Sequence, residues 1–208
     1  MSLMKDENQV SALRQKYPTL THTSYGLFST LKPHENVDKT HQYQGKIVCA
    51  TSGHLDREFY ALRCNQRIGM INRSIPFIDG MGENRIFIFE KIKDEYYEYT
   101  VSSKNFIPVT DDNEKFTGEW ISKTPVKPLS VRHGTREDII SKTSAGIYLI
   151  QDLDAFYKIL GDHQLREKMK NPRLALSVVQ ELVKQHILRQ VKAPFYRPSP
   201  EKIRHSND

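Results

Sequence analysis

Short runs of β-branched and aromatic residues, each closed by turn-forming residues, occupy the middle of the chain. The run Thr19 to Ser24 stops at Tyr25–Gly26, and Lys46 to Ala50 is a compact apolar run. Such runs are typical of strands rather than helices. Strands are therefore predicted at residues 19–24, 46–50, 85–91, 96–101, 106–109 and 119–122. The two runs on either side of Lys93–Asp94 are expected to form an antiparallel hairpin.

Helical periodicity lies on either side of this region. A short helix is predicted within residues 1–17, ended by Pro18, because proline disfavours helix in the residue before it. Further helices are predicted at residues 56–63, 135–140, 152–160, 163–170 and 172–190. Pro172 suits the first turn of the last one. Residues 69–82 are predicted to be an irregular connector.

The order of these elements predicts an α+β fold: a mostly antiparallel sheet with a C-terminal all-helical extension. The expected organisation has four parts. These are a helical or flexible lead at 1–18, an α+β domain at 19–140, a helical annex at 141–192 and a mobile basic tail at 193–208.

Composition is compatible with a soluble protein. The 208 residues are 38% hydrophobic, enough to bury a core, and the net charge is +6. The charge permits anionic partners without selecting one. Cys49 and Cys64 form no disulfide framework, which favours free thiols and a reducing compartment. No secretory signal and no run of eighteen apolar residues is present, so a cytoplasmic location without membrane insertion is expected, with export as an effector by a signal-independent route left open.

Three short segments carry residues suited to chemistry. The first holds His22, Thr23 and Ser24 and is followed by Leu31–Lys32–Pro33; the second holds Thr51 and Ser52 and runs on to Tyr60; the third holds Glu119. Each has a simpler structural interpretation. A histidine on an apolar strand is commonly structural, Thr51–Ser52 can cap a helix, and Glu119 can be a solvated strand residue.

Taken in order, the three segments resemble the ADP-ribosyltransferase-like fold, which includes mono-ADP-ribosyltransferase toxins, poly(ADP-ribose) polymerases and RNA 2′-phosphotransferases. The resemblance spans about residues 19–138 and leaves out the C-terminal part. It implies a split sheet that holds NAD⁺, the substrate that supplies ADP-ribose, in its cleft.

The resemblance also implies roles for individual residues. His22 would hydrogen-bond the adenosine-side ribose, and backbone groups near Thr23 and Ser24 would meet the nicotinamide amide. Thr51 and Ser52 would support the cleft, with Tyr60 packed near it. Glu119 would hold the 2′-hydroxyl of the nicotinamide ribose while the glycosidic bond breaks. A carboxylate fixed beside developing positive charge stabilises such a transition state.

Three positions depart from the family pattern. Thr23 stands where the family generally has glycine, which permits close backbone approach. Thr117 stands where arginine-modifying toxins carry a second acid, so an arginine acceptor is disfavoured. Family members with the tyrosine-rich histidine motif carry an aromatic residue near the position of Ala50, and this chain has Thr51–Ser52 there. The RNA 2′-phosphotransferases need a basic constellation that is not evident around His22 or Glu119.

Two functions therefore stay open. The first is an NAD-dependent transferase of the kind found in bacterial effectors and toxins, which moves ADP-ribose to an unidentified acceptor, expected to be a protein rather than a nucleic acid. The second is a non-catalytic binding module with a degenerate nucleotide cleft, which engages a protein or nucleic-acid partner through its basic helical end. No metal site is predicted, since His34, His41 and His54 lack ligand spacing.

Overall fold

The computed structural model describes residues 2–35, 45–53, 61–62, 86–164, 168 and 172–193. The chain divides into two compact units. The first unit contains residues 1–62 and 93–138, and the second contains residues 63–92 and 139–208. Each unit has its own sheet and its own core.

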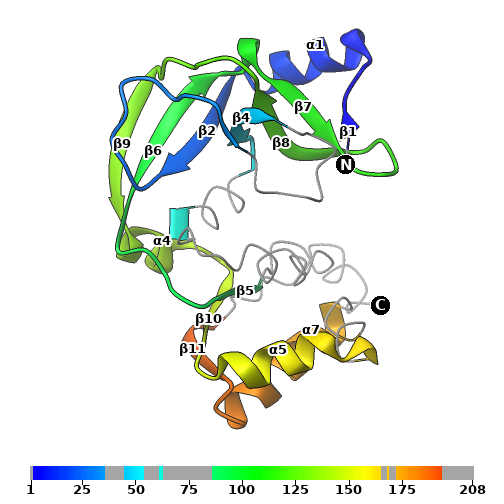
Figure 1. The fold of residues 1–208 in the computed structure, drawn as a ribbon, viewed down its shortest axis with the longest axis vertical. Helices are drawn as coiled ribbons and strands as arrows, with labels where there is room; N and C mark the ends of the chain where they lie inside the picture. The colour runs from blue at the N-terminus through cyan, green and yellow to red at the C-terminus, as the bar shows by residue number, and fades with distance from the viewer. Residues whose placement is uncertain are drawn as a thin grey trace, which may run out of the picture. The chain divides into compact units, whose positions relative to one another are not determined.

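The first unit is built on an eight-stranded sheet (Figure 1). Its strands are β1 (Ser2–Leu3), β2 (Thr19–Ser24), β3 (His34–Glu35), β4 (Lys46–Thr51), β6 (Glu95–Ser102), β7 (Ile107–Thr110), β8 (Phe116–Ser122) and β9 (Ser130–Thr135). Seven of them follow the order β1-β7-β8-β4-β2-β6-β9, and β3 pairs with β4. All these pairings are antiparallel, which confirms the predicted sheet.

The helix α1 (Glu7–Lys16) covers part of one sheet face beside β7 (Figure 1). Asp6 begins the helix by accepting hydrogen bonds from two backbone N–H groups of the first turn. Leu13 and Tyr17 pack against a core cluster that contains Trp120 and Tyr99, both fully buried. The predicted helix before Pro18 is therefore confirmed. A short 3₁₀ turn, η1 (Ser103–Asn105), joins β6 to β7.

The sheet of the first unit is nearly divided between β2 and β4. These two strands share a single residue pair, Thr21 with Thr51. By contrast, β2 pairs with β6 along its whole length, and β4 pairs with β8 over four residues. The strands β2, β6 and β9 are thus joined to the rest of the sheet by one pair of residues.

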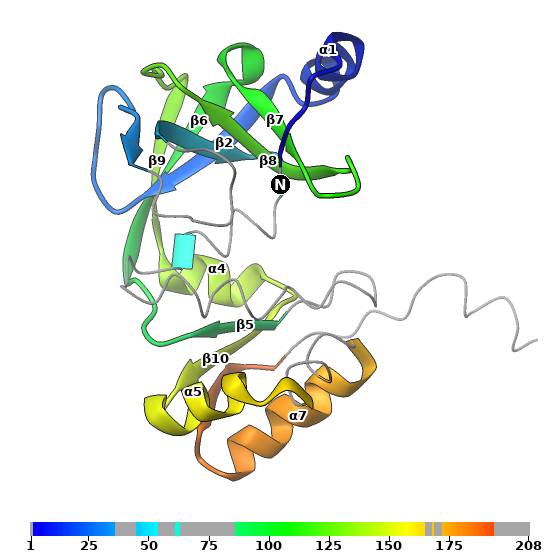
Figure 2. The same ribbon diagram turned by 45° about the vertical axis from the view of Figure 1, so that its right-hand side comes forward.

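The second unit has a three-stranded sheet in the order β11-β10-β5 (Figure 2). Its strands are β5 (Ile86–Phe89), β10 (Gly146–Ile150) and β11 (Leu188–Lys192), and its helices are α5 (Leu153–Gly161) and α7 (Pro172–Lys184). The strand β5 runs parallel to β10, and β11 runs antiparallel to it. Side chains from both helices and all three strands form one core around Tyr148 and Phe156. The helix α4 (Arg136–Lys142) crosses the boundary between the units along the chain.

The predicted hairpin of residues 85–91 and 96–101 is wrong. The strand β5 pairs with β10 in the second unit, whereas β6 pairs with β2 and β9 in the first. The chain passes from one unit to the other at Ile92–Lys93, inside the turn that was expected to close the hairpin. Two neighbouring strand patterns do not show whether the strands share a sheet.

The prediction of an all-helical annex at residues 141–192 is also wrong. The helices α5 and α7 are present there, but so are the strands β10 and β11. The helix α4 agrees with the predicted helix 135–140, and the strand β9 before it was not predicted. The predicted helix 172–190 ends at Lys184, because His186 adopts a positive φ of 59° and the chain turns into β11. Most of the helix expected at 56–63, most of that at 163–170, the connector 69–82 and all of the tail after residue 193 lie outside the described residues.

None of the helices in the described part of the chain is both long and apolar enough to cross a bilayer.

The core of the second unit contains one polar atom without a partner. The hydroxyl of Tyr148 is buried and makes no hydrogen bond among the described residues, and burial raises the pKa of this side chain. A buried, unsatisfied hydroxyl costs about 1–3 kcal/mol. We expect Tyr148→Phe to raise the free energy of unfolding by about 1 kcal/mol in urea denaturation. The exposed Tyr157 offers a matched control, since Tyr157→Phe should change nothing. A loss of stability in Tyr148→Phe contradicts the assignment.

Candidate functional site

We call the junction of β2 and β4, where the sheet is nearly divided, the split. Three residues near it lie in one row across the sheet. Thr21 of β2 is opposite Thr51 of β4, and Thr51 is opposite Glu119 of β8. Directly opposed residues project from the same face, with Cβ atoms about 5 Å apart. Thr51 is buried and Glu119 is half-buried. The structure therefore brings together Thr51 and Glu119, two of the predicted site residues, which are far apart in sequence.

The backbone just before Glu119 is held by the end of β4. The carbonyl oxygen of Gly118 accepts hydrogen bonds from the backbone N–H of Ser52 at 3.0 Å, the Ser52 hydroxyl at 3.2 Å and the Thr51 hydroxyl at 3.3 Å. Gly118 has a φ of 87°, a conformation that favours glycine. On the other side, the Glu119 N–H donates to the Thr117 hydroxyl at 3.2 Å. We call this arrangement the Gly118 clamp.

The hydroxyl of Ser52 has a second function in the clamp. It accepts a hydrogen bond from the indole Nε1 of Trp120 at 3.3 Å, and Trp120 is fully buried. Thr51 also closes a local turn, since its hydroxyl accepts from the Gly53 N–H at 3.1 Å. Both hydroxyls thus position β8 against β4. Whether they also cap a helix lies outside the described residues, as does Tyr60.

His22 bridges the gap between the divided strands. Its Nδ1–H donates to the Cys49 carbonyl at 2.6 Å, and its ring centroid lies 5.8 Å from that of Tyr99. Because a carbonyl only accepts, this contact selects the tautomer with hydrogen on Nδ1. Burial lowers the pKa of His22 below its ordinary 6.5, the Cys49 carbonyl opposes this change, and His34 and Lys93 add to the lowering. Residue Cys49 itself is a free, exposed cysteine.

His22 does not share a face with Glu119. It follows Thr21 directly in β2, and successive residues of a strand point to opposite faces. Thr21 shares the face of Glu119, so His22 projects from the other face, where its cross-strand partner Tyr99 lies. The imidazole reaches the split from one side and the carboxylate lies on the other.

The two remaining candidates in β2 differ in position. Thr23 is half-buried, pairs with Glu98 and projects from the Glu119 face. Ser24 projects from the His22 face, and its hydroxyl accepts from the Gly26 N–H at 3.4 Å. Ser24 therefore has a local structural role in the turn after β2.

Tyr99 is a residue that the sequence analysis missed. Its hydroxyl donates to the Gly26 carbonyl at 2.6 Å and accepts from the Phe28 N–H at 2.8 Å. Tyr99 thereby holds the loop after β2 in place and packs against His22. In the sequence it is one of three tyrosines of β6, with Tyr96 and Tyr97, and no feature distinguishes it from the other two.

No group of three His, Cys, Asp or Glu side chains with a metal-binding arrangement occurs among the residues that the structure describes. Comparison with known proteins found no family model, no curated protein and no solved structure that matches this chain.

The contribution of the Gly118 clamp to the free energy of unfolding can be measured. Ser52→Ala leaves the buried Nε1 of Trp120 without its partner, so we expect a loss of about 1–3 kcal/mol in the free energy of unfolding. In a Trp120→Phe background the donor is already absent, and Ser52→Ala should cost less. Urea denaturation of the four proteins of this cycle measures the difference. Equal costs in both backgrounds are incompatible with the Trp120–Ser52 hydrogen bond.

The lowered pKa of His22 makes stability depend on pH. The unfolded chain binds a proton on this side chain near pH 6.5, whereas the folded chain binds it only at lower pH. The stability contributed by neutral His22 is therefore present above pH 6.5 and is lost as the pH falls from there to the folded pKa. We expect His22→Gln to lose less stability than the wild type between about pH 7.5 and about pH 5. The same pH dependence in both proteins would exclude this origin.

Proposed function

We propose that the first unit is an NAD-dependent transferase of the ADP-ribosyltransferase-like fold, which moves ADP-ribose to an acceptor molecule. One observation carries the proposal. Glu119 is held by the Gly118 clamp in a row with Thr51 and Thr21, at the single residue pair that joins the two parts of the sheet. The sequence resemblance assigns the reaction to this carboxylate.

The chemistry required of Glu119 is electrostatic. A carboxylate can accept a hydrogen bond from a ribose hydroxyl and stabilise the positive charge that develops on the ribose as its bond to nicotinamide breaks. Such a group acts best when its position is fixed before the reaction. Both polar groups of the peptide between Gly118 and Glu119 are engaged, because the Gly118 carbonyl accepts from the Thr51 hydroxyl and the Glu119 N–H donates to the Thr117 hydroxyl. They hold the backbone of Glu119 in β8, between β7 and β4. An acceptor nucleophile then forms a bond to the ribose carbon from which nicotinamide has departed.

Threonine hydroxyl groups lie on the Glu119 face beside the carboxylate. Thr21 and Thr23 project from this face on the β2 side of the split, and Thr23 is half-buried. Under the proposal these side chains lie on the nucleotide side of the sheet. The side chain of Thr23 limits how closely a ligand can approach its backbone, in contrast to glycine.

A second function is favoured by the position of His22. This side chain leaves the opposite face from Glu119 and its Nδ1–H is engaged by the Cys49 carbonyl. An imidazole in that arrangement stabilises the split rather than contacting a ligand beside Glu119. The same sheet would then be a binding module without catalysis, and Glu119 would be a structural residue.

Glu119→Gln separates the two functions. If Glu119 is catalytic, this change should lower nicotinamide release from NAD⁺ by about 100-fold or more while the melting temperature stays near that of the wild type. Glu7→Gln, on the exposed surface of α1, is the control and should leave release unchanged. Nicotinamide release that survives Glu119→Gln contradicts the catalytic role.

Thermal shift with NAD⁺ tests the binding step alone. A ligand at a hundred times its dissociation constant stabilises the folded state by about 2.7 kcal/mol. The absence of both release and a shift at millimolar NAD⁺ selects the binding module.

A further inference from the structure

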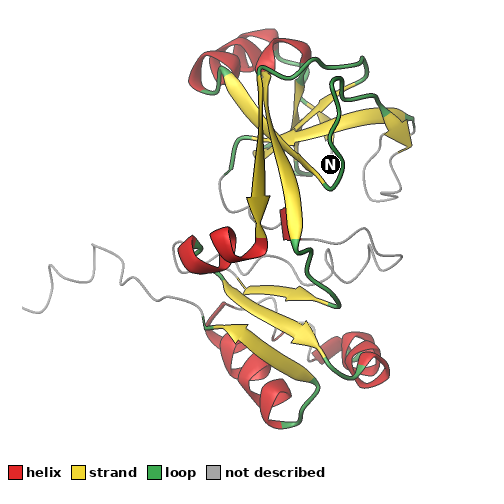
Figure 3. Ribbon diagram, turned by 90° about the vertical axis from the view of Figure 1, so that its left-hand side faces the viewer, coloured by secondary structure: helices red, strands yellow, loops and turns green. Residues whose placement is uncertain are grey.

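The strand β9 is the last strand of the sheet in the first unit, and among the described residues it pairs only with β6. Its first four residues are exposed, and it runs directly into α4 (Figure 3). An edge strand offers a row of backbone donors and acceptors to another chain. Folded proteins commonly block such an edge with proline, a bulge or an inward-pointing charge. The pairing of β9 with β6 is regular from Ser130 to Thr135, without a bulge.

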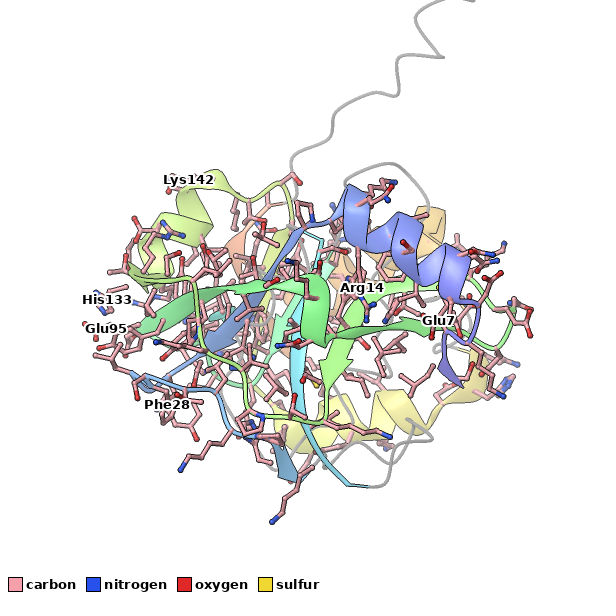
Figure 4. The ribbon with its side chains drawn as sticks, turned by 90° about the horizontal axis from the view of Figure 1, so that it is seen from above. Glu7, Arg14, Phe28, Glu95, His133 and Lys142 are labelled. Atoms are coloured by element: carbon pink, nitrogen blue, oxygen red, sulfur yellow. The ribbon has the colours of Figure 1, made fainter. Side chains whose placement is uncertain are left out.

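Apolar side chains lie next to this edge. Leu129 is 63% exposed and Val131 is 41% exposed. The loop held by Tyr99 adds Leu27 and Phe28, exposed by 67% and 46%. Figure 4 shows Phe28 on the same side of the ribbon as Glu95 and His133, away from Glu7 of α1. Contiguous exposed apolar residues are a feature of interaction surfaces.

Charge is distributed unevenly along the edge. The segment 120–134, which leads into β9 and forms most of it, contains Lys123, Lys127 and Arg132 but no acidic residue. At the other end of the strand lie the carboxylates of Asp94, Glu95, Glu137 and Asp138. Arg136 contacts Asp94 and Glu137, and the imidazole of His133 contacts Glu95. The exposed members of this acidic end are Asp94 at 78%, Glu95 at 68% and Glu137 at 69%. The edge is thus basic where β9 begins and acidic where it ends.

We propose that the β9 edge pairs with the β9 edge of a second copy of this chain in an antiparallel arrangement, forming a symmetric dimer with a continuous sheet. Antiparallel pairing places the basic start of each strand beside the acidic end of the other, and two-fold symmetry makes this contact twice. Parallel pairing would oppose like charges. The charge distribution therefore favours a second copy of this chain as the partner, because the same edge carries both the basic region and the acidic region that must face each other.

The position of the two-fold axis follows from the same contact. When Val131 lies opposite its own copy, Lys127, three residues before β9, comes level with residue 135 of the partner, which is the last residue before α4 and stands two residues before Glu137. This register covers Val131 at the centre of the contact and brings Leu129 beside the partner strand. The proposal does not depend on the transferase activity, since the Glu119 row lies on β2, β4 and β8.

Sedimentation velocity over a range of protein concentrations tests the dimer. The full chain should show a monomer–dimer equilibrium, and Val131→Lys should weaken it at least tenfold, because two lysines would then face each other at the axis. Leu174→Lys makes the same kind of change at a 44% exposed residue of α7 and should leave the equilibrium unchanged. Circular dichroism of each variant verifies that it is folded.

A charge exchange tests the orientation. Lys127→Glu should weaken the dimer, and the double variant Lys127→Glu with Glu137→Lys should recover most of the loss, since each pair again joins opposite charges. A chain that stays monomeric at all concentrations overturns the proposal. A dimer that is insensitive to Val131→Lys overturns it as well, because the contact then lies elsewhere. Failure of the double variant to recover contradicts the antiparallel arrangement.

Discussion

The carbonyl oxygen of Gly118 is the acceptor on which the geometry of the site depends. It receives three hydrogen bonds from Thr51 and Ser52, and Ser52 in turn receives the indole N–H of the buried Trp120. These contacts join the end of β4 to the start of the regular part of β8 and to the core. Leaving a buried donor or acceptor without its partner costs more free energy than the hydrogen bond contributes, so these hydrogen bonds are retained together. Glu119 is the next residue after Gly118 and is positioned as a consequence.

The weak junction between β2 and β4 gives the clamp its functional interest. One residue pair, Thr21 with Thr51, joins two parts of a sheet whose other strand pairs are longer. His22 closes part of the gap through the Cys49 carbonyl. A gap between strands exposes backbone groups that a sheet would otherwise pair, and a polar ligand can use such groups. The proposed transferase places its nucleotide on the Glu119 face of this junction, and the imidazole of His22 lies on the opposite face.

Local patterns were sufficient to predict several elements, including β2, β4, β7, the second half of β8, and the helices α1 and α5. They were insufficient wherever the partner was distant in sequence. The apolar run of β5 is as strand-like as that of β6, yet the two lie in different units. β9 was missed because Ser130–Thr135 contains one apolar residue. Thr51 and Glu119 lie opposite each other in the sheet, whereas His22 lies on the other face, so the three predicted residues do not share one face. The face of His22 could not be predicted, because a one-residue change in register reverses it and the register is set by tertiary contacts.

The proposed transferase requires NAD⁺ to bind beside Glu119, at the junction of β2 and β4. The most direct measurement is a titration of ¹⁵N-labelled full-length protein with NAD⁺, followed by amide NMR shifts. If NAD⁺ binds there, we expect saturable amide shifts centred on Thr21, Thr51 and Glu119, with smaller changes across β9 and across the strands of the second unit. Shifts that are absent at millimolar NAD⁺, or that are centred outside β2, β4 and β8, contradict it.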